Sequence, residues 1–318
     1  MRFSDWKADH FSDTLPAMKE LAKVLIVFKK STFQIQAVEH RDPRFLKLIE
    51  EGHSNVAKVK TAHDEHYETL QALQDELTRR GVKYDSVARA DLGDSVDTYD
   101  LVISVGGDGT FLDASHAIYK APLLGVNSAR SSSFGHFCLA NLDNFSQILD
   151  EISSGKLEPR PLLRLQLVLN GTPLAEPVLN EVLVCHDNPA GTSRYSLQIG
   201  DVHEEQRSSG VLIGTPSGST GTCKSAGGEV MPIISQQYQF IVREPWTRPD
   251  QRYQLNSAVL ERNQEIHMTS IMRTGALYID GSHIDYSFSL GDELIIRATG
   301  VDLNAYIDPR VNDIFRKS

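Results

Sequence analysis

A glycine-rich segment, Gly106-Gly107-Asp108-Gly109-Thr110, joins an apolar run at 101–105 to a helical pattern at 111–119. A strand that leads through a glycine turn into a helix can cradle a phosphate. Glycines let the backbone approach an anion closely, and the first N–H groups of the helix point at it. A further apolar run at 122–126 follows. This order predicts a βαβ unit and therefore a parallel sheet.

Asp108 is the unusual member of this turn. A carboxylate about 4 Å from a phosphate is repelled by roughly 1 kcal/mol in water, and by more in a dry site. We therefore expect it to act as general base for a hydroxyl that attacks a phosphate, or as a partner of bound Mg²⁺. The alternative interpretation is a tight turn without function, because Asp-Gly favours turns wherever it occurs.

Composition and charge argue against several classes of protein. The 318 residues carry a formal net charge of −10 and are 40% apolar and 23% charged, without a block rich in Lys or Arg. These values are typical of a soluble chain of two domains and argue against a nucleic-acid or membrane surface. Residues 1–10 lack the apolar core of a signal peptide, and we expect a cytoplasmic protein. The cysteines, at 138, 185 and 223, have no metal-ligand spacing, which favours free thiols.

The first half of the chain alternates strand and helix signals. The run Val24–Phe28 predicts a buried strand, and apolar residues at helical spacing over 67–77 predict a helix that ends before Gly81. The polar run Asn127–Arg130 follows a strand, as Gly106 does, so we expect both to line one crevice at the carboxyl ends of the sheet. The polar stretch His40–Ala62 predicts a helix or an insertion.

The pattern changes at 155–161. Alternating residues over Leu163–Leu169, an Asn170-Gly171 turn and an answering strand over Val178–Val184 predict a hairpin. Further strands are predicted at 195–199, 211–213, 238–242, 258–261, 276–279 and 293–297. We therefore expect an α/β domain with a parallel Rossmann-like sheet over 1–158 and a mostly antiparallel β domain over 159–318, with its last ~15 residues packed back on the first domain.

A second group of motifs lies in the β half. The segment Gly214–Thr222 and its continuation 224–228 offer many hydroxyls and backbone N–H groups, which suit ribose and phosphate oxygens. A flexible linker is the alternative interpretation, although the segment directly follows the apolar strand at 211–213. Asn180-Glu181 interrupts another apolar strand. Taken alone, that pair is also typical of an exposed edge.

With GGDGT at 106–110, Asn180-Glu181 and TPSGST at 215–220 in this order, the chain resembles the NAD kinase family from Leu21 to Ile307. The resemblance implies transfer of the γ-phosphate of ATP, or of inorganic polyphosphate, to the 2′-hydroxyl of the adenosine ribose of NAD⁺, giving NADP⁺. It also implies Mg²⁺ carried on the donor and a homodimer or homotetramer. Lipid kinases of the diacylglycerol or sphingosine type share GGDGT but lack TPSGST. A third hypothesis is a non-catalytic regulator that binds NADP(H).

The resemblance also implies roles for individual residues. Asp108 matches the general base, and the phosphate-binding turn is matched by Gly106, Gly107, Gly109 and Thr110. The positions that match dinucleotide-binding residues are Asn127, Asn180, Glu181, Arg207, Thr215, Ser217, Gly218, Ser219, Thr220, Gly221, Thr222 and Ser225. Two further candidates are Ser209, where the family is acidic, and Asp280, in a predicted hairpin turn at 280–283. No metal site is expected from the protein alone.

The sequence departs from the common pattern of the family at several positions. Thr222 stands where the family has a tyrosine that stacks on the base, so a stacking platform is lost. The element at 129–139, with Phe28–Ser31 and Arg243–Pro245, resembles the divergent mitochondrial-type branch more than the bacterial branch. Separately, His63 and His66 have a spacing that a metal could use, but without a third ligand we expect a solvated helix face.

Overall fold

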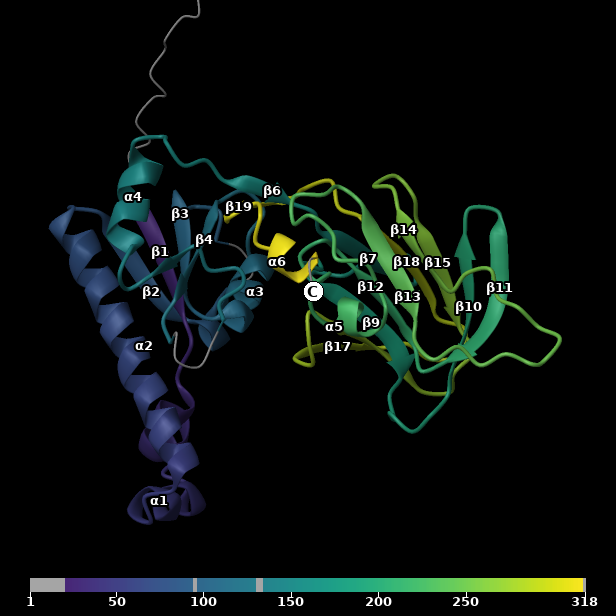
Figure 1. Ribbon diagram of the computed structural model, residues 1–318, viewed down its shortest axis with the longest axis horizontal. Helices are drawn as coiled ribbons and strands as arrows, with labels where there is room; N and C mark the ends of the chain where they lie inside the picture. Colours follow the sequence, from purple (N-terminus) through teal and green to yellow (C-terminus); the bar gives the residue numbers. More distant parts are fainter. Residues whose placement is uncertain (1–20, 94–95, 130–133, 317–318) are drawn as a thin grey trace, which may run out of the picture.

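The computed structural model describes residues 21–93, 96–129 and 134–316 (Figure 1). The chain forms an α/β lobe around a largely parallel sheet and a β lobe made of two antiparallel sheets. This arrangement confirms the predicted fold class. Within the described ranges, no helix combines the length and the apolar character that crossing a membrane requires.

The sheet of the α/β lobe has the order β2-β1-β3-β4-β19-β6, with β5 paired to β4. Strands β1 to β5 pair in parallel, β19 is parallel to β4, and β6 is antiparallel to β19. The central strands β3 and β4 are buried along their whole length, because helices cover both faces of the sheet. The strands are β1 (Lys23–Phe28), β2 (Lys83–Ala88), β3 (Leu101–Gly106), β4 (Leu123–Asn127), β5 (Ala140–Asn141), β6 (Arg160–Leu162) and β19 (Leu303–Tyr306).

The helices divide between the two faces of this sheet. Apolar residues of α2 (Ser54–Arg79) and α4 (Phe145–Ser153) pack in one cluster with β1 and β3, and α3 (Asp108–His116) packs in another. The helix predicted over 67–77 is confirmed, and it begins earlier. The polar stretch 40–62 forms α1 (Pro43–Glu50) and the first turns of α2, after a short π-helix at Gln34–Glu39. A 3₁₀ turn, Arg89–Asp91, follows β2.

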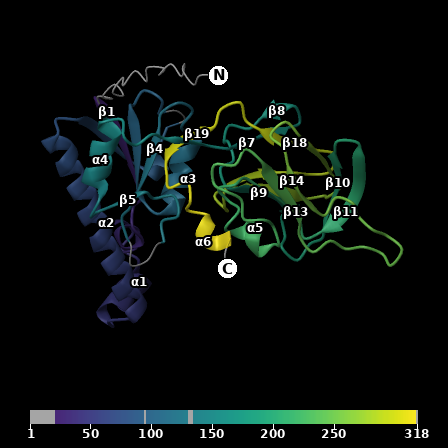
Figure 2. The ribbon, with the colours of Figure 1, turned by 45° about the horizontal axis from the view of Figure 1, so that its top comes forward.

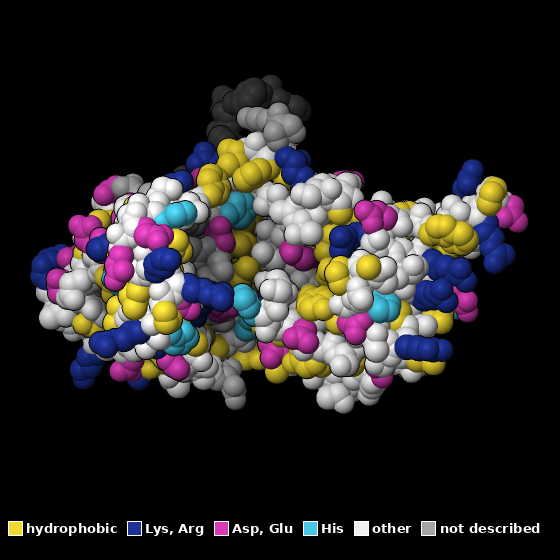
Figure 3. Space-filling model, turned by 90° about the horizontal axis from the view of Figure 1, so that it is seen from below, with side chains coloured by type: hydrophobic (Ala, Val, Ile, Leu, Met, Phe, Trp, Pro, Cys, Tyr) yellow, Lys and Arg dark blue, Asp and Glu magenta, His cyan; other side chains and the backbone are white. Residues whose placement is uncertain are grey.

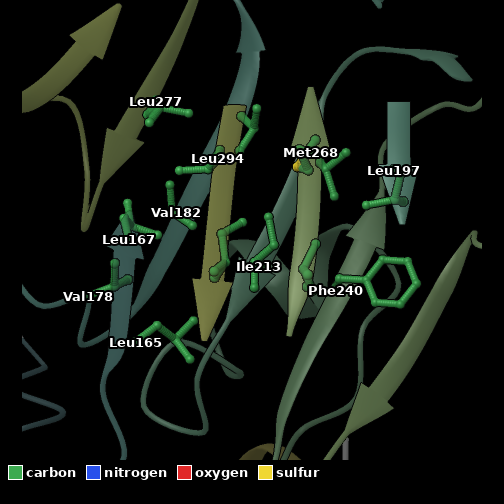
Figure 4. Close-up of a cluster of buried hydrophobic side chains, with 14 of the residues drawn as sticks. Leu165, Leu167, Val178, Val182, Leu197, Ile213, Phe240, Met268, Leu277 and Leu294 are labelled. Carbon is green, nitrogen blue, oxygen red and sulfur yellow. The ribbon is translucent and has the colours of Figure 1, made fainter. Parts of the chain in front are cut away.

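The β lobe packs two sheets face to face around a shared apolar core, shown in Figure 4. Strand β10 alternates buried and less buried residues along its length, because one face of its sheet meets the core, whereas β12 and β13 are buried throughout. One sheet has the order β11-β10-β15-β18-β7-β8 and the other β14-β13-β12-β9-β16-β17. The first consists of β7 (Leu165–Leu169), β8 (Thr172–Pro173), β10 (Ser193–Ile199), β11 (Val202–Ser208), β15 (Ile266–Ser270) and β18 (Glu293–Ala298). The second consists of β9 (Glu181–His186), β12 (Val211–Gly214), β13 (Tyr238–Val242), β14 (Ser257–Leu260), β16 (Gly275–Ile279) and β17 (Ile284–Ser287).

The predicted hairpin between Leu163–Leu169 and Val178–Val184 is wrong. Asn170-Gly171 does form a turn, but it joins β7 to the two-residue strand β8. Residue 178 makes a single bridge to Leu165, and β9 lies in the other sheet, between β12 and β16. Pro173 and Pro177 have no N–H to donate, which weakens the pairing with β7, although the N–H groups of Leu174 and Val178 still donate to the carbonyls of Leu167 and Leu165.

The last described residues lie between the two lobes. After β19 returns to the α/β sheet, the short helix α6 (Asp313–Arg316) lies beside α3 and α5 (Thr222–Ser225), as both ribbon views show (Figures 1 and 2). Strands β6 and β19 also belong to the sheet of the α/β lobe. Both come after residue 158, where the sequence predicts that the first domain ends. The division into domains at residue 158 stays a prediction.

Candidate functional site

The glycine turn is built where the predicted strand, turn and helix meet. Gly106 ends β3, Gly107 caps the helix, and Asp108 is the first residue of α3. A Cβ atom on Gly106 would lie 2.2 Å from Oγ1 of Thr110, so only glycine fits there. The first N–H groups of α3 are therefore presented at the carboxyl edge of the sheet, where an anion can bind.

The carboxylate of Asp108 is oriented by the backbone. Its Oδ1 accepts a hydrogen bond of 2.9 Å from the N–H of Phe137. Among the residues that the structure describes, none donates a hydrogen bond to Oδ2. Asp108 thus has one oxygen fixed by the protein and one available to accept a proton from a ligand.

The ends of two neighbouring strands meet at this turn, as the sequence predicts. Gly106 and Asn127 are partners in register, and the N–H of Ser128 donates to the carbonyl of Gly106 over 2.9 Å. Asn127 is buried, and a Cβ atom on Gly135 would lie 2.5 Å from its Nδ2. The fourth member of the predicted polar run, Arg130, lies outside the described residues.

His66 is a fully buried residue of α2, not part of a solvated face. Its Nδ1 lies 2.7 Å from Oγ of Ser128, and burial lowers its pKa to about 4. His63 lies 2.7 Å from Oγ of Ser31 through its own Nδ1. The prediction of a solvated histidine pair is therefore wrong for His66, because α2 turns this side chain toward the strand end that supports the glycine turn.

Two cations that the sequence reasoning did not single out stand near the turn. Lys29 follows β1, and burial lowers its pKa, with the charge of Arg89 as the second cause. Arg89 follows β2, pairs with Asp113 at 2.9 Å, and would lie 3.6 Å from a Cβ atom on Gly109. Their position directly after parallel strands was the available signal, because such residues lie at the ligand-binding edge of the sheet.

The TPSGST loop packs directly on the Asn180-Glu181 pair. The N–H of Thr215 donates to the carbonyl of Asn180 over 2.8 Å. A Cβ atom on Gly218 would lie 2.5 Å from that carbonyl oxygen and 2.7 Å from Oε2 of Glu181. The glycine therefore permits two motifs that are distant in the sequence to touch.

Asp280 holds the same pair from the other side. Its carboxylate is 1% exposed and accepts the backbone N–H groups of Leu179, Asn180 and Glu181 at 2.8, 2.7 and 3.1 Å. It also lies 2.9 Å from Nε2 of His116, the last residue of α3. The predicted hairpin turn at 280–283 is confirmed between β16 and β17. Asp280 thereby ties the helix that begins at Asp108 to the β lobe.

The charge of Glu181 is disfavoured where it stands. Burial first and the neighbouring carboxylate of Asp280 second raise its pKa to about 7, while a hydrogen bond with Thr222 opposes the shift. Glu181 therefore changes its charge near neutral pH. A carboxyl group of this kind can donate or accept a hydrogen bond toward a bound hydroxyl.

The hydroxyls of the loop divide into two groups. Thr215 donates to the carbonyl of Leu179, and Ser219 donates to that of Pro216, so both are used within the protein. Oγ of Ser217 and Oδ1 of Asn180 are buried and lack a hydrogen-bond partner in the described part of the chain. These two atoms are candidates for ligand contacts. The remaining predicted residues form the partly or fully exposed rim of the loop: Thr220, Gly221, Thr222 and Ser225.

The space between the lobes is a recess. Histidine and acidic side chains gather in it when the molecule is seen from below (Figure 3). A cleft of about 300 Å³ enters beside His116 and Asp113 of α3 on one side and Glu176 of the β lobe on the other. Leu179 packs with Phe111 in one apolar cluster, so the floor of the recess joins the lobes.

Arg207 and Ser209 lie away from this recess. They precede β12, whereas the TPSGST loop follows it, and the four residues of that strand separate them by roughly 13 Å. Arg207 lies over the ring of Trp246 at 5.5 Å, and Oγ of Ser209 donates to Glu244. Both line a hollow of about 300 Å³ with Arg194. A single chain therefore does not bring these two predicted residues to Asp108.

The remaining candidates concern metals and thiols. Cys138, Cys185 and Cys223 are free thiols, as predicted. Within the described ranges, no three His, Cys, Asp or Glu side chains gather as a metal site would require.

The structure thus places the glycine turn of an α/β lobe opposite the TPSGST loop of a β lobe, and comparisons with known proteins identify the class of protein that has this architecture. The family model described as "ATP-NAD kinase N-terminal domain" matches residues 24–157. A probable NADH kinase of Oryza sativa subsp. japonica is 39% identical over 254 residues, 73% of this chain and 78% of that protein. An NADH kinase of Arabidopsis thaliana is 35% identical over 276 residues, 78% of this chain and 86% of that protein. The chain belongs to the NAD kinase family, whose members transfer phosphate to an alcohol group.

Solved structures share the fold across both lobes. An NAD kinase from Archaeoglobus fulgidus in complex with ATP has a TM-score of 0.64 and 19% identity, covering 92% of this chain and 96% of that one. A yeast NADH kinase complexed with NADH has a TM-score of 0.66 and 16% identity, covering 94% of this chain and 87% of that one. The resemblance of the sequence to this family is thereby confirmed.

Proposed function

We propose that this enzyme transfers the γ-phosphoryl group of ATP to the 2′-hydroxyl of the adenosine ribose of a nicotinamide dinucleotide. The carboxylate of Asp108 carries the proposal, because it stands at the phosphate-binding turn with Oδ2 available. Asp108 takes the ribose proton as the ribose oxygen bonds to the γ-phosphorus. The bond from that phosphorus to the bridging oxygen breaks, and ADP leaves.

The donor phosphates occupy the carboxyl edge of the α/β sheet in this proposal. The turn at 106–110 supplies backbone N–H groups, and Lys29 and Arg89 supply positive charge beside it. Mg²⁺ bound to the donor neutralises its phosphates. The ATP complex of the archaeal relative of the same fold supports ATP as the donor.

The acceptor lies on the TPSGST loop and the Asn180-Glu181 pair. Oγ of Ser217 and Oδ1 of Asn180 are polar, buried and unpartnered within the described residues, which favours a hydroxyl-rich ligand there. NADH is proposed as an acceptor alongside NAD⁺, because the rice and Arabidopsis relatives are named NADH kinases and share 39% and 35% identity. A bacterial relative named NAD kinase, from Erwinia tasmaniensis, shares 27%.

A homodimer or homotetramer is proposed on the position of Arg207 and Ser209. They lie at the far end of β12 from the TPSGST loop. If they contact the dinucleotide, they do so in the site of a second copy. Free cysteines and the charge of −10 support a cytoplasmic location.

An assay with purified protein, Mg²⁺ and ATP tests the activity. NAD⁺ and NADH are supplied in turn, and NADP(H) is detected enzymatically. We expect product with both acceptors and none without Mg²⁺. Polyphosphate in place of ATP tests the donor, and diacylglycerol or sphingosine in place of the dinucleotide tests a lipid kinase. Tight NADP(H) binding without turnover would instead indicate a regulator. Relatives named NAD or NADH kinase that match both lobes do not favour either alternative.

Mixed oligomers test the shared site. Asp108→Asn subunits are co-expressed with Arg207→Ala subunits, each inactive or weak alone. If Arg207 serves the neighbouring site, an oligomer that holds both variants contains an intact site and regains activity. Activity equal to the sum of the separate variants contradicts the shared site.

A further inference from the structure

The C-terminal segment crosses between the two halves of the proposed site. Residues 312–316 follow the last strand of the α/β sheet, and α6 lies between α3 and α5 in both ribbon views (Figures 1 and 2). These helices begin at Asp108 and at Thr222 respectively. The segment is therefore placed to contact both the glycine turn and the TPSGST loop.

Asn312 is the residue of this segment that holds the TPSGST loop. It is fully buried, and its Nδ2 donates to the carbonyl of Pro216 at 3.0 Å and to that of Met231 at 2.7 Å. It also lies 3.4 Å from Oγ of Ser219, which receives the N–H of Met231 at 3.0 Å. One side-chain amide thus links the turn at 216–219 to the irregular segment that follows α5.

Phe315 contacts the opposite side of the recess. Its ring centroid lies 6.0 Å from that of Phe134 and 5.7 Å from that of His136. Its carbonyl accepts a hydrogen bond from Nζ of Lys224 at 3.1 Å, so the segment is also tied to α5, the helix that follows the loop. His136 precedes Phe137, whose N–H orients Asp108. The contacts therefore run without a gap from the TPSGST loop to the base.

The side chains of Asn312 and His136 also face each other. Nε2 of His136 and Oδ1 of Asn312 are both buried and have no well-formed partner in the described part of the chain. The two side chains are close enough for a hydrogen bond that raises the pKa of His136, although burial, the larger cause, lowers it. The carboxylate of Asp108 acts on the same imidazole.

We propose that Asn312 is a positioning residue that fixes the dinucleotide loop relative to Asp108, with Phe315 as its partner on the side of the base. The assignment of the loop to the dinucleotide rests on the proposed function. A loop held from one side only can shift its ligand by an ångström, and transfer between two bound substrates is sensitive to such shifts. Residues 312–316 hold the TPSGST loop from the second side.

Asn312→Asp is the sharpest test, because it keeps the shape and the acceptor but replaces the amide donor with a carboxylate facing two carbonyl oxygens. We expect the Kd and KM for NAD⁺ or NADH to rise about tenfold, the effect of about 1.4 kcal/mol, with the KM for ATP unchanged. Asn312→Ala is expected to act in the same direction. The matched control is Asn304→Ala at an exposed position of β19, which should change neither constant.

Phe315→Leu tests the other side of the segment and keeps an apolar side chain. It touches the residues beside Asp108, so we expect kcat to fall about threefold while the dinucleotide Kd stays within twofold of wild type. The two variants together separate loop positioning from base positioning. Thermal unfolding of every variant records any general loss of stability.

A purely structural role for Asn312 predicts a different outcome. Asn312→Asp would then lower the unfolding temperature while the dinucleotide Kd, measured by calorimetry on folded protein, stays within twofold of wild type; that result overturns the proposal. If Asn312→Asp does not fold, an unchanged kcat in Phe315→Leu overturns it. Failure of the proposed function appears separately, as wild-type protein that forms no NADP(H), and the calorimetric Kd then still tests Asn312.

Discussion

The glycine turn at 106–110 and the TPSGST loop at 215–220 reach their positions by different means. The turn is made by consecutive residues at the junction of β3 and α3, and the N–H of Phe137, from elsewhere in the described chain, orients its carboxylate. The loop depends on Asn180 beneath it and on Asn312 behind it. The carboxylate of Asp108, the proposed base, is thus placed by local geometry, whereas the TPSGST loop, the proposed dinucleotide site, is placed by contacts distant in the sequence. Substitutions should distinguish the two regions. We expect those at the glycine turn to lower kcat, and those around the TPSGST loop to weaken dinucleotide binding or lower the stability of the protein.

Asp108→Asn should have the largest effect on the reaction. The amide keeps the shape and the hydrogen bond from Phe137 but cannot accept the ribose proton. We expect kcat to fall by roughly 2 to 4 orders of magnitude, with the dinucleotide Kd and the unfolding temperature nearly unchanged. Steady-state kinetics and calorimetry measure both. Asp91→Asn, at an exposed aspartate of the same lobe, is the control. Near-full turnover in the Asp108 variant would remove Asp108 as the base.

Asp280→Ala should destabilise the region beneath the TPSGST loop, whereas Asp108→Asn removes the proposed base. The variant leaves three backbone N–H groups and His116 without their buried acceptor. We expect the free energy of unfolding to fall by about 3 to 5 kcal/mol, measured by denaturant titration. Asp285→Ala, at an exposed position of the adjacent strand β17, should change it little. Equal stability of the two variants would show that Asp280 does not hold the Asn180-Glu181 pair.

The same contrast explains what the sequence could reveal. The turn was predictable because its strand, glycines and helix are contiguous, and Asn127 because it follows the neighbouring strand. His116, His136 and Asn312 carry no local signal, since each acquires its importance from a residue far along the chain.

The wrong predictions also concern contacts between residues that are distant in the sequence. Alternation and a turn predict a hairpin over 163–184, whereas β8 pairs over two residues and β9 pairs with strands of the other sheet. His66 was placed on a solvated face because spacing alone does not show which side of α2 meets Ser128. Arg207 and Ser209 match the family by motif, and only the strand between them and the loop reveals their separation. Periodicity identified the elements, whereas partner choice depended on tertiary contacts.

Glu181 links the stability of the loop region to pH. Its pKa is raised from 4.5 to about 7, so between these values the folded protein holds a proton that the unfolded chain has released. The stability that protonation of Glu181 supports is therefore present below about pH 4.5 and is lost as the pH rises to about 7. As the pH rises from about 4.5 to about 7, we expect the free energy of unfolding of wild type, relative to that of Glu181→Gln, to fall by about 3 kcal/mol.

Denaturant titrations of both proteins at several pH values measure this difference. Groups common to both proteins, such as His66, cancel in the comparison. Glu68→Gln, at a carboxyl group of α2 in the other lobe, is the control and should follow wild type within the window. Parallel curves for wild type and Glu181→Gln would show that Glu181 titrates normally.

Thr222→Tyr should have the smallest effect, because residue 222 is exposed at the rim of the loop and its replacement leaves the core intact. A tyrosine there offers a ring on which adenine can stack, worth about 1 kcal/mol, so the dinucleotide Kd should fall about fivefold. The substitution also removes the hydroxyl that bonds Glu181. Thr222→Val, which loses the hydroxyl without adding a ring, is therefore the proper reference, and calorimetry on both variants isolates stacking from the lost hydrogen bond. Equal affinities in Tyr and Val variants would place the adenine away from residue 222, and the rim would then hold its ligand through the loop backbone and Asn180 instead.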